Sequence, residues 1–153
     1  MTTTAIEVRD LSHRYDTDLV LRNIDLTVEQ GEVFGFLGHN GAGKTTAVNI
    51  LTTLLTPTSG TAQVNGFDVV AQRNEVTASI GYLPSEVRLY PHLTAAENLA
   101  FFAKLSGIGN PQSAVRETLT YLGCADLADR RVGSFSTGMR QRIGIARALA
   151  TGP

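Results

Sequence analysis

The residues best suited to do chemistry form a glycine-rich run from Gly38 to Thr45, which reads Gly-His-Asn-Gly-Ala-Gly-Lys-Thr. Glycines at this spacing let the backbone curve around an anion and direct successive N–H groups toward it. Lys44 adds a cation that reaches terminal phosphate groups, and the Thr45 hydroxyl is a suitable ligand for Mg²⁺. The run predicts a phosphate-binding loop, and a glycine-rich turn that matches by chance is the alternative. The residues expected to hold the phosphates are Gly38, His39, Asn40, Gly41, Ala42, Gly43, Lys44, Thr45 and Thr46.

The segments on either side of this loop have the pattern that such a loop needs. Residues Val33 to Leu37 are apolar without a polar face, which is typical of a strand buried on both sides. A helical pattern through Val48, Leu51 and Leu55 follows, and its N-terminus would add partial positive charge. This strand–loop–helix order is the P-loop arrangement. By itself it does not choose between kinases, GTPases and transport ATPases.

Further strands are predicted from alternating and continuous apolar residues. Two antiparallel strands before the loop are expected through Ile6–Leu11 and Ile24–Val28. Asn65 and Gly66 predict a two-residue hairpin turn. Residues Ser79 to Leu83 are typical of a second buried strand, which Pro84 ends.

Helical patterns replace strands from Pro91 to about Arg130. Thr94 and Glu97 have the spacing of a capping box, and Asn110-Pro111 is a typical helix start. A last helix is expected from about Ser136 to Ala150. Its apolar stripe would consist of Met139, Ile143, Ala146 and Ala150.

Composition restricts the environment and the partners. The net charge of −1 over 153 residues gives no electrostatic support for a nucleic-acid partner. Cys124 is the single cysteine, so no disulfide forms within the chain and a reducing compartment is expected. The N-terminus lacks a secretory signal. No apolar run approaches the roughly 20 residues that span a bilayer, so a membrane role would require a partner.

A second motif lies downstream of Lys44, with the helical stretch between them. Residues Phe135 to Arg142 read Phe-Ser-Thr-Gly-Met-Arg-Gln-Arg. Ser136 can cap the helix that follows, and free N–H groups near Gly138 can face a phosphate. An ordinary capped amphipathic helix is the alternative. The run resembles the signature motif of ATP-binding cassette (ABC) proteins, usually Leu-Ser-Gly-Gly-Gln, and the resemblance extends over the whole chain.

The resemblance implies an α/β fold of the P-loop ABC ATPase type. A mixed central sheet, an antiparallel β subdomain and a helical subdomain at about 91–135 would form one domain over residues 1–153. ATP and Mg²⁺ would be the ligands, with Thr45 on the metal and Tyr15 stacked on adenine. For Tyr15, a partly buried tyrosine at a strand end is the alternative. The residues expected to act on the ATP of a second subunit are Ser136, Thr137, Gly138 and Met139.

The sequence departs from the family pattern at several positions. Ser85, followed by Glu86, stands where a glutamine usually contacts the metal and the attacking water, and Thr137 and Met139 replace a glycine and a glutamine. Serine is too short for that contact unless a water bridges. In the family, a strand that ends in Asp-Glu (Walker B) follows the signature helix, and in this sequence it would lie beyond Pro153. We therefore expect a truncated domain with an incomplete core sheet and no catalytic residue, inactive as residues 1–153.

The resemblance is strongest to the ATPase subunits of drug, sodium, polysaccharide or lipid exporters. It implies a homodimer or heterodimer of ATP-binding subunits that couples ATP binding and hydrolysis to export through a separate membrane-spanning permease. The expected location is the cytoplasm, peripheral to the inner face of the cell membrane. Two other interpretations are a fragment that binds ATP without hydrolysing it and a non-transport ABC ATPase. His13, His39 and His92 are interpreted as solvated or structural histidines.

Overall fold

The computed structural model describes residues 3–152 and divides the chain between Ser79 and Ile80. Within that range, the first unit consists of a four-stranded sheet with two helices, and the second contains three α-helices and two short 3-10 helices. The prediction of one domain with a helical subdomain at about 91–135 stays a prediction.

The sheet of the first unit is antiparallel throughout, in the order β2-β1-β3-β4. The two predicted N-terminal strands form a long hairpin in which Val8 pairs with Leu26. Asn65 and Gly66 form the predicted turn between β3 and β4, with φ angles of 51° and 81°, as a mirror-image hairpin turn requires. The strands are β1 (Thr4–Tyr15), β2 (Asp18–Glu29), β3 (Ser59–Val64) and β4 (Phe67–Asp68).

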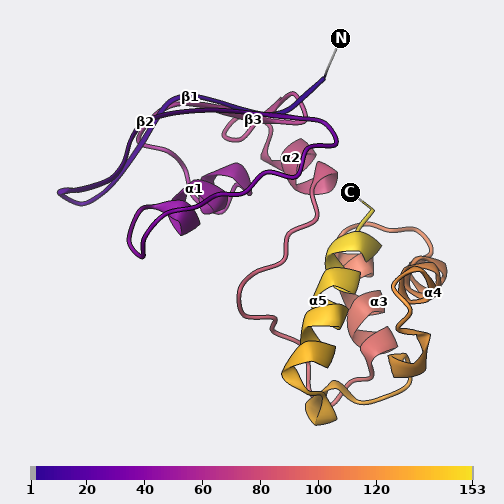
Figure 1. Ribbon diagram of the computed structural model, residues 1–153. Coiled ribbons are helices and arrows are strands. Elements are labelled where there is room, and N and C mark those ends of the chain that lie inside the picture. The colour runs from indigo at the N-terminus through magenta and orange to yellow at the C-terminus, as the bar shows by residue number, and fades with distance from the viewer. Residues whose placement is uncertain (1–2, 153) are drawn as a thin grey trace. The chain divides into compact units, whose positions relative to one another are not determined.

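Helix α1 (Lys44–Leu51) lies against this sheet (Figure 1) and buries Ala47 and Ile50. The predicted helix extended to Leu55, but Thr52 is the C-cap and Thr53, the next residue, takes a positive φ of 64°. A β-branched residue in that conformation cannot continue a right-handed helix, so the prediction was too long. The sheet residues buried in this core are Val8, Leu11, Leu21, Val28, Ala62 and Val64.

Two predicted buried strands are absent from the described residues. Val33–Leu37 forms no strand, and Val33 is 99% exposed. Ser79 ends helix α2 (Arg73–Ser79), which the sequence did not predict, and the residues up to Leu83 form an irregular segment. A strand requires a hydrogen-bonded neighbour. No segment of residues 3–152 pairs with either run, so the predictions of these strands and of a mixed central sheet were wrong for this range.

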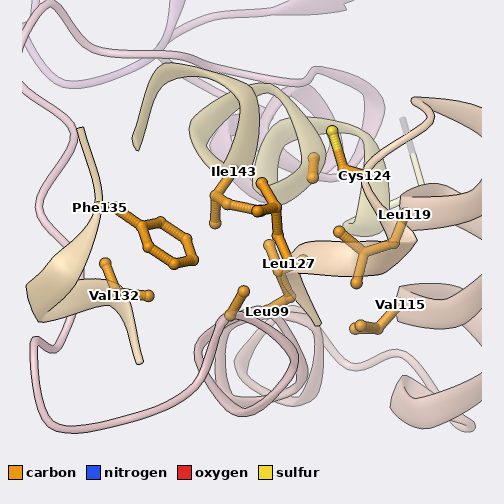
Figure 2. Close-up of a cluster of buried hydrophobic side chains, with 10 residues drawn as sticks. Leu99, Val115, Leu119, Cys124, Leu127, Val132, Phe135 and Ile143 are labelled. Carbon is orange, nitrogen blue, oxygen red and sulfur yellow. The ribbon is translucent and has the colours of Figure 1, made fainter. Parts of the chain in front are cut away.

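The second unit packs α3 (Ala95–Leu105), α4 (Pro111–Tyr121) and α5 (Thr137–Ala150) around one apolar core. Figure 2 shows side chains from all three helices and from the segments between them meeting in this cluster. The stripe predicted for the last helix is confirmed, because Ile143, Ala146 and Ala150 are buried and Met139 packs against the core. The cluster consists of Ala95, Leu99, Val115, Leu119, Cys124, Leu127, Val132, Phe135, Ile143 and Ala146.

The predicted helix starts are confirmed by their hydrogen bonds. The Thr94 hydroxyl accepts from the Glu97 N–H at 3.2 Å, and the Glu97 carboxylate accepts from the Thr94 N–H at 2.7 Å. These bonds hold the pKa of Glu97 below its usual value, chiefly through the backbone N–H of Thr94. At the next helix, the Asn110 side chain accepts from the Ser113 N–H at 3.1 Å. Both helices therefore begin where side-chain oxygens satisfy their first N–H groups.

A buried amide holds the segment that leads into α3. The Asn98 side chain is fully buried, and its oxygen accepts from the Tyr90 N–H at 2.7 Å. Its nitrogen donates to the carbonyl oxygens of Tyr90 and Thr94 at 3.1 and 2.9 Å. Because all three bonds go to the backbone, Asn98 fixes the path of the chain from Tyr90 to the cap of α3.

Replacing the capping threonine tests this helix start. Thr94→Ala should lower the free energy of unfolding by about 1 kcal/mol, whereas Thr94→Ser keeps the oxygen and should have little effect. Because the pKa of folded Glu97 is lowered, the box stabilises the fold above the carboxyl group's unfolded pKa and loses this contribution as pH falls through the folded value. Chemical denaturation across this acidic range measures both effects. Equal losses for alanine and serine would contradict the capping role.

Candidate functional site

The glycine-rich loop connects the irregular segment before it to helix α1. Gly41 and Gly43 take positive φ angles of 85° and 81°, which L-residues with a side chain rarely adopt. Gly43 is the N-cap of α1 and makes no side-chain cap, so the first N–H groups of the helix remain available. Such N–H groups, next to the positive end of the helix, form an anion site.

The Lys44 side chain is hydrogen-bonded to the loop that precedes it. Its Nζ donates hydrogen bonds to the carbonyl oxygens of Gly38 and His39, each at 2.7 Å. The side chain therefore folds back over the loop that precedes it, and its charge lies at the carbonyl oxygens of that loop. His39 Nδ1 donates to the Asn40 carbonyl oxygen at 2.8 Å, which further orders the turn. The predicted loop residues thus form one turn with a cation and backbone donors on the same segment.

The loop is fixed to the sheet at Gly43. A Cβ atom at this position would lie 2.6 Å from Leu21 Cδ2 and 2.9 Å from the Val20 carbonyl oxygen. The β2 strand therefore approaches the loop as closely as a glycine allows. The sequence motif requires a glycine here but does not reveal this contact, because Leu21 lies far from Gly43 in the sequence.

Tyr15 ends β1 in the same unit and is 47% exposed. Its ring packs edge-to-face on the ring of His13, with the centroids 4.7 Å apart. One side of the tyrosine is thus supported and much of the ring remains open to solvent. An exposed, supported aromatic ring is the type of surface on which a nucleotide base stacks.

The signature residues lie at the start of α5 in the second unit. Ser136 is the N-cap, and its hydroxyl accepts from the Met139 N–H at 3.3 Å, so the predicted cap is confirmed. Gly138 has nothing within 4 Å of where a Cβ would lie, which leaves its backbone open to a close approach. Thr137, also in the first turn, is exposed.

Ser85 lies beside this helix start. It lines a polar hollow of about 550 Å³ together with residues of the signature motif. Sequence reasoning named Ser85 and Ser136 separately but did not predict that they share a surface. The remaining lining residues are Glu86, Val87, Phe135, Thr137, Arg140 and Gln141.

The donor atoms available for a metal ion are few. Among residues 3–152, no group of three or more His, Cys, Asp or Glu side chains is placed to hold one. Thr45 lies in the first turn of α1 with an exposed side chain, and its hydroxyl is a hard oxygen ligand. Mg²⁺ typically takes one or two protein oxygens and completes its shell with phosphate oxygens and water. A single hydroxyl beside a phosphate loop fits that ion.

Comparison with known proteins decides the family. The family model described as ABC transporter matches residues 21–153. The chain belongs to the ABC transporter family. It is 42% identical to the ABC transporter ATP-binding protein NatA of Bacillus subtilis (strain 168), over 97% of this chain and 63% of the relative. It is 40% identical to the bacitracin transport ATP-binding protein BcrA of Bacillus licheniformis, over 95% of this chain and 47% of the relative.

Solved structures of the family confirm the predicted fold class, the P-loop α/β fold of ABC ATPases. An ATP binding subunit of an ABC transporter matches with a TM-score of 0.83 and 28% identity, over 98% of this chain and 63% of the other. The dimeric bacterial ABC transporter cassette MJ0796 matches with a TM-score of 0.82 and 27% identity, over 97% and 70%. The chain thus spans about half to two thirds of the length of the curated relatives it matches.

Substitution of Gly43 tests the contact that fixes the loop. Gly43→Ala adds a Cβ against Leu21 and the Val20 carbonyl, whereas Gly66→Ala adds one at the same φ of 81° with nothing within 4 Å. The backbone strain is therefore matched, and the difference reports crowding. Gly43→Ala should lower the free energy of unfolding by about 1–3 kcal/mol more than Gly66→Ala. Equal losses in chemical denaturation would show that the strand does not constrain the loop.

Proposed function

We propose that this chain is the ATP-binding part of an ABC transporter subunit that couples ATP binding and hydrolysis to export. The observation that carries the proposal is the loop geometry, in which Lys44, the first residue of α1, folds back onto the turn that contains Gly41 and Gly43. Membership of the ABC transporter family supports it. The relatives NatA and BcrA are ATP-binding proteins of transporters by name.

In this proposal the triphosphate of ATP lies in the turn from Gly38 to Thr46. The loop N–H groups and the helix N-terminus bind the phosphate oxygens. Lys44 exchanges a carbonyl contact for the β- and γ-phosphates, where a charge-assisted bond is stronger than a bond to a neutral oxygen. Tyr15 receives the adenine on its open side.

Mg²⁺ would be held by the Thr45 hydroxyl and by the nucleotide's phosphate oxygens. When bound, the ion neutralises charge that develops on the transferred phosphoryl group. The Thr45 hydroxyl is held in the first turn of α1, because its neighbours Thr46 and Ala47 are buried. Ser85 is the candidate that would orient water through a hydrogen-bonded bridge.

A second copy or a paralogous subunit would bring its ATP to the start of α5. Ser136, Gly138 and the first N–H groups of that helix supply donors without a nearby side chain that blocks approach. Arg140 follows on the same helix, and its Nε donates to the Phe135 carbonyl at 3.3 Å. N–H groups at a helix start bind phosphate, and in this proposal the second subunit delivers it.

The membrane partner in this proposal is a separate permease. None of the helices in residues 3–152 has the length and apolarity required to cross a bilayer. Partly exposed aromatic rings gather at the start of the second unit, where Tyr90 packs on Phe101 and Phe102. The Arg147 guanidinium lies 4.7 Å from the Phe102 ring centroid, and burial lowers its pKa. Aromatic side chains with arginine are enriched at protein–protein contacts, so this surface supports the proposed contact with a permease. In the proposal, the permease holds the subunit at the inner face of the cell membrane.

Loss of the Lys44 charge tests the nucleotide site. Lys44→Ala should weaken ATP binding about ten- to hundredfold, the equivalent of a lost charge-assisted contact. Lys44 and Lys104 are the two lysines of the chain, and Lys104 lies exposed on α3. Lys104→Ala is therefore the matched control and should leave the affinity unchanged. Equal ATP affinities for wild type and Lys44→Ala in a calorimetric titration would refute the site.

Substitution of Ser136 tests the role of the second motif. In the full-length protein, Ser136→Arg should leave ATP binding to the monomer unchanged and abolish hydrolysis, because bulk and charge at this start of α5 prevent a second subunit from closing. Ser136→Asp retains a capping oxygen but repels phosphate, so it should also bind ATP and fail to hydrolyse it. The measurements are nucleotide titration and steady-state phosphate release. Loss of monomer binding would make Ser136 a local cap only.

A further inference from the structure

His13 is a buried polar side chain in direct contact with the exposed ring of Tyr15. Only 6% of His13 is exposed, against 47% of Tyr15. The two ring planes meet at 81° with their centroids 4.7 Å apart. This edge-to-face geometry is the arrangement that aromatic pairs favour. The buried His13 ring therefore packs against the exposed ring of Tyr15.

One nitrogen of the histidine ring lies beside Thr58. Thr58 Oγ1 lies 3.5 Å from His13 Nδ1 and already accepts from the Arg14 N–H at 3.0 Å. A hydroxyl has a single hydrogen, which is free to point toward Nδ1. The His13–Thr58 contact can therefore form with either atom as the donor. Thr58 is anchored in turn, because its N–H donates to the Ser12 carbonyl at 3.0 Å.

The other ring nitrogen has no conventional partner. Within residues 3–152, His13 Nε2 is buried without a hydrogen bond. A buried polar atom without a hydrogen-bond partner costs stability, whether it is a donor or an acceptor, so the packing around it matters. The negatively charged face of an aromatic ring is a weak acceptor for an N–H group. Tyr15 is the ring packed edge-to-face against this histidine.

We infer that His13 is a positioning residue that holds the Tyr15 ring in the orientation in which it receives a nucleotide base. The inference rests on the proposed function and deepens it, because it names the residue that orients the Tyr15 ring, called here the base platform. A tyrosine at the end of a hairpin otherwise samples several rotamers, and binding must restrict them. Edge-to-face support from a buried ring removes part of that entropy before the base arrives. The interpretation of His13 as a purely structural histidine is the alternative that the experiment must exclude.

The same strand pair connects the platform to the phosphate loop. His13 on β1 pairs with Leu21 on β2. Leu21 is the side chain against which Gly43 is packed. One hairpin therefore sets the position of the base platform and that of the loop, so a change at His13 must be tested separately on the two ends of the nucleotide.

The experiment compares ATP with inorganic triphosphate, which has no base, on the full-length protein. His13→Ala should weaken ATP about three- to tenfold, the range expected for one aromatic pair, and leave triphosphate affinity unchanged. His13→Phe keeps a buried ring edge and should retain ATP affinity within about twofold. Competition against a fluorescent ATP analogue measures both ligands for every variant.

A double-mutant cycle with Tyr15→Ala supplies the decisive comparison. Tyr15→Ala alone should weaken ATP roughly five- to hundredfold if stacking is the contact. Adding His13→Ala should then cost nothing more, because its effect passes through the tyrosine. A second loss of ATP affinity in that background, or an equal loss of triphosphate affinity, would make His13 merely structural and overturn the inference.

Failure of the proposed function gives a different pattern. If wild-type protein binds ATP no better than triphosphate and Tyr15→Ala changes nothing, the base platform itself is wrong and the inference is overturned with it. If Tyr15→Ala weakens ATP but His13→Ala does not, the proposed nucleotide site stands and only the role of His13 is refuted.

Discussion

The close approach of Gly43 to strand β2 is the contact on which the first unit depends. A Cβ at that position would lie 2.6 Å from Leu21 Cδ2, so only a glycine lets the helix start meet the hairpin. The same glycine needs its positive φ to turn the loop into α1. The close contact with the sheet and the turn around an anion therefore both require glycine at position 43. This shared requirement ties the phosphate loop to the sheet core and, through β1, to His13 and Tyr15.

The two units achieve order by different means. The helical unit has a closed apolar cluster from three helices, with side-chain caps and the buried Asn98 amide at its connections (Figure 2). The first unit buries one face of its sheet beneath α1 but leaves Val33 and Leu37 almost fully exposed. Apolar residues that pack on nothing within residues 3–152 contribute little stability there. The phosphate loop follows directly after this exposed segment, so its order comes from Lys44 and from the Gly43 contact rather than from a buried strand.

Backbone groups supply much of the chemistry proposed for this chain. At the start of α1 and again at the start of α5, the donors are N–H groups of the first turn that have no partner within the helix. Side chains such as Lys44 and Ser136 chiefly order these groups, through carbonyl bonds in one case and a cap in the other. Such sites tolerate changes in neighbouring side chains, which fits a signature motif with Thr137 and Met139 at positions where the family usually has other residues.

The sequence by itself determined the local conformations, which depend on residues adjacent in the chain. The hairpin turn at Asn65-Gly66, the capping box at Thr94 and the loop from Gly38 to Thr45 could all be predicted, because a local conformation requires those residue types at that spacing. Only the tertiary structure decided which apolar runs become strands, since Val33–Leu37 requires a partner that its own sequence cannot supply. It also decided that Leu21 meets Gly43, that Ser85 lies beside Ser136, and that a buried histidine supports Tyr15. These contacts join residues distant in sequence or depend on burial, and neither is encoded in a local pattern.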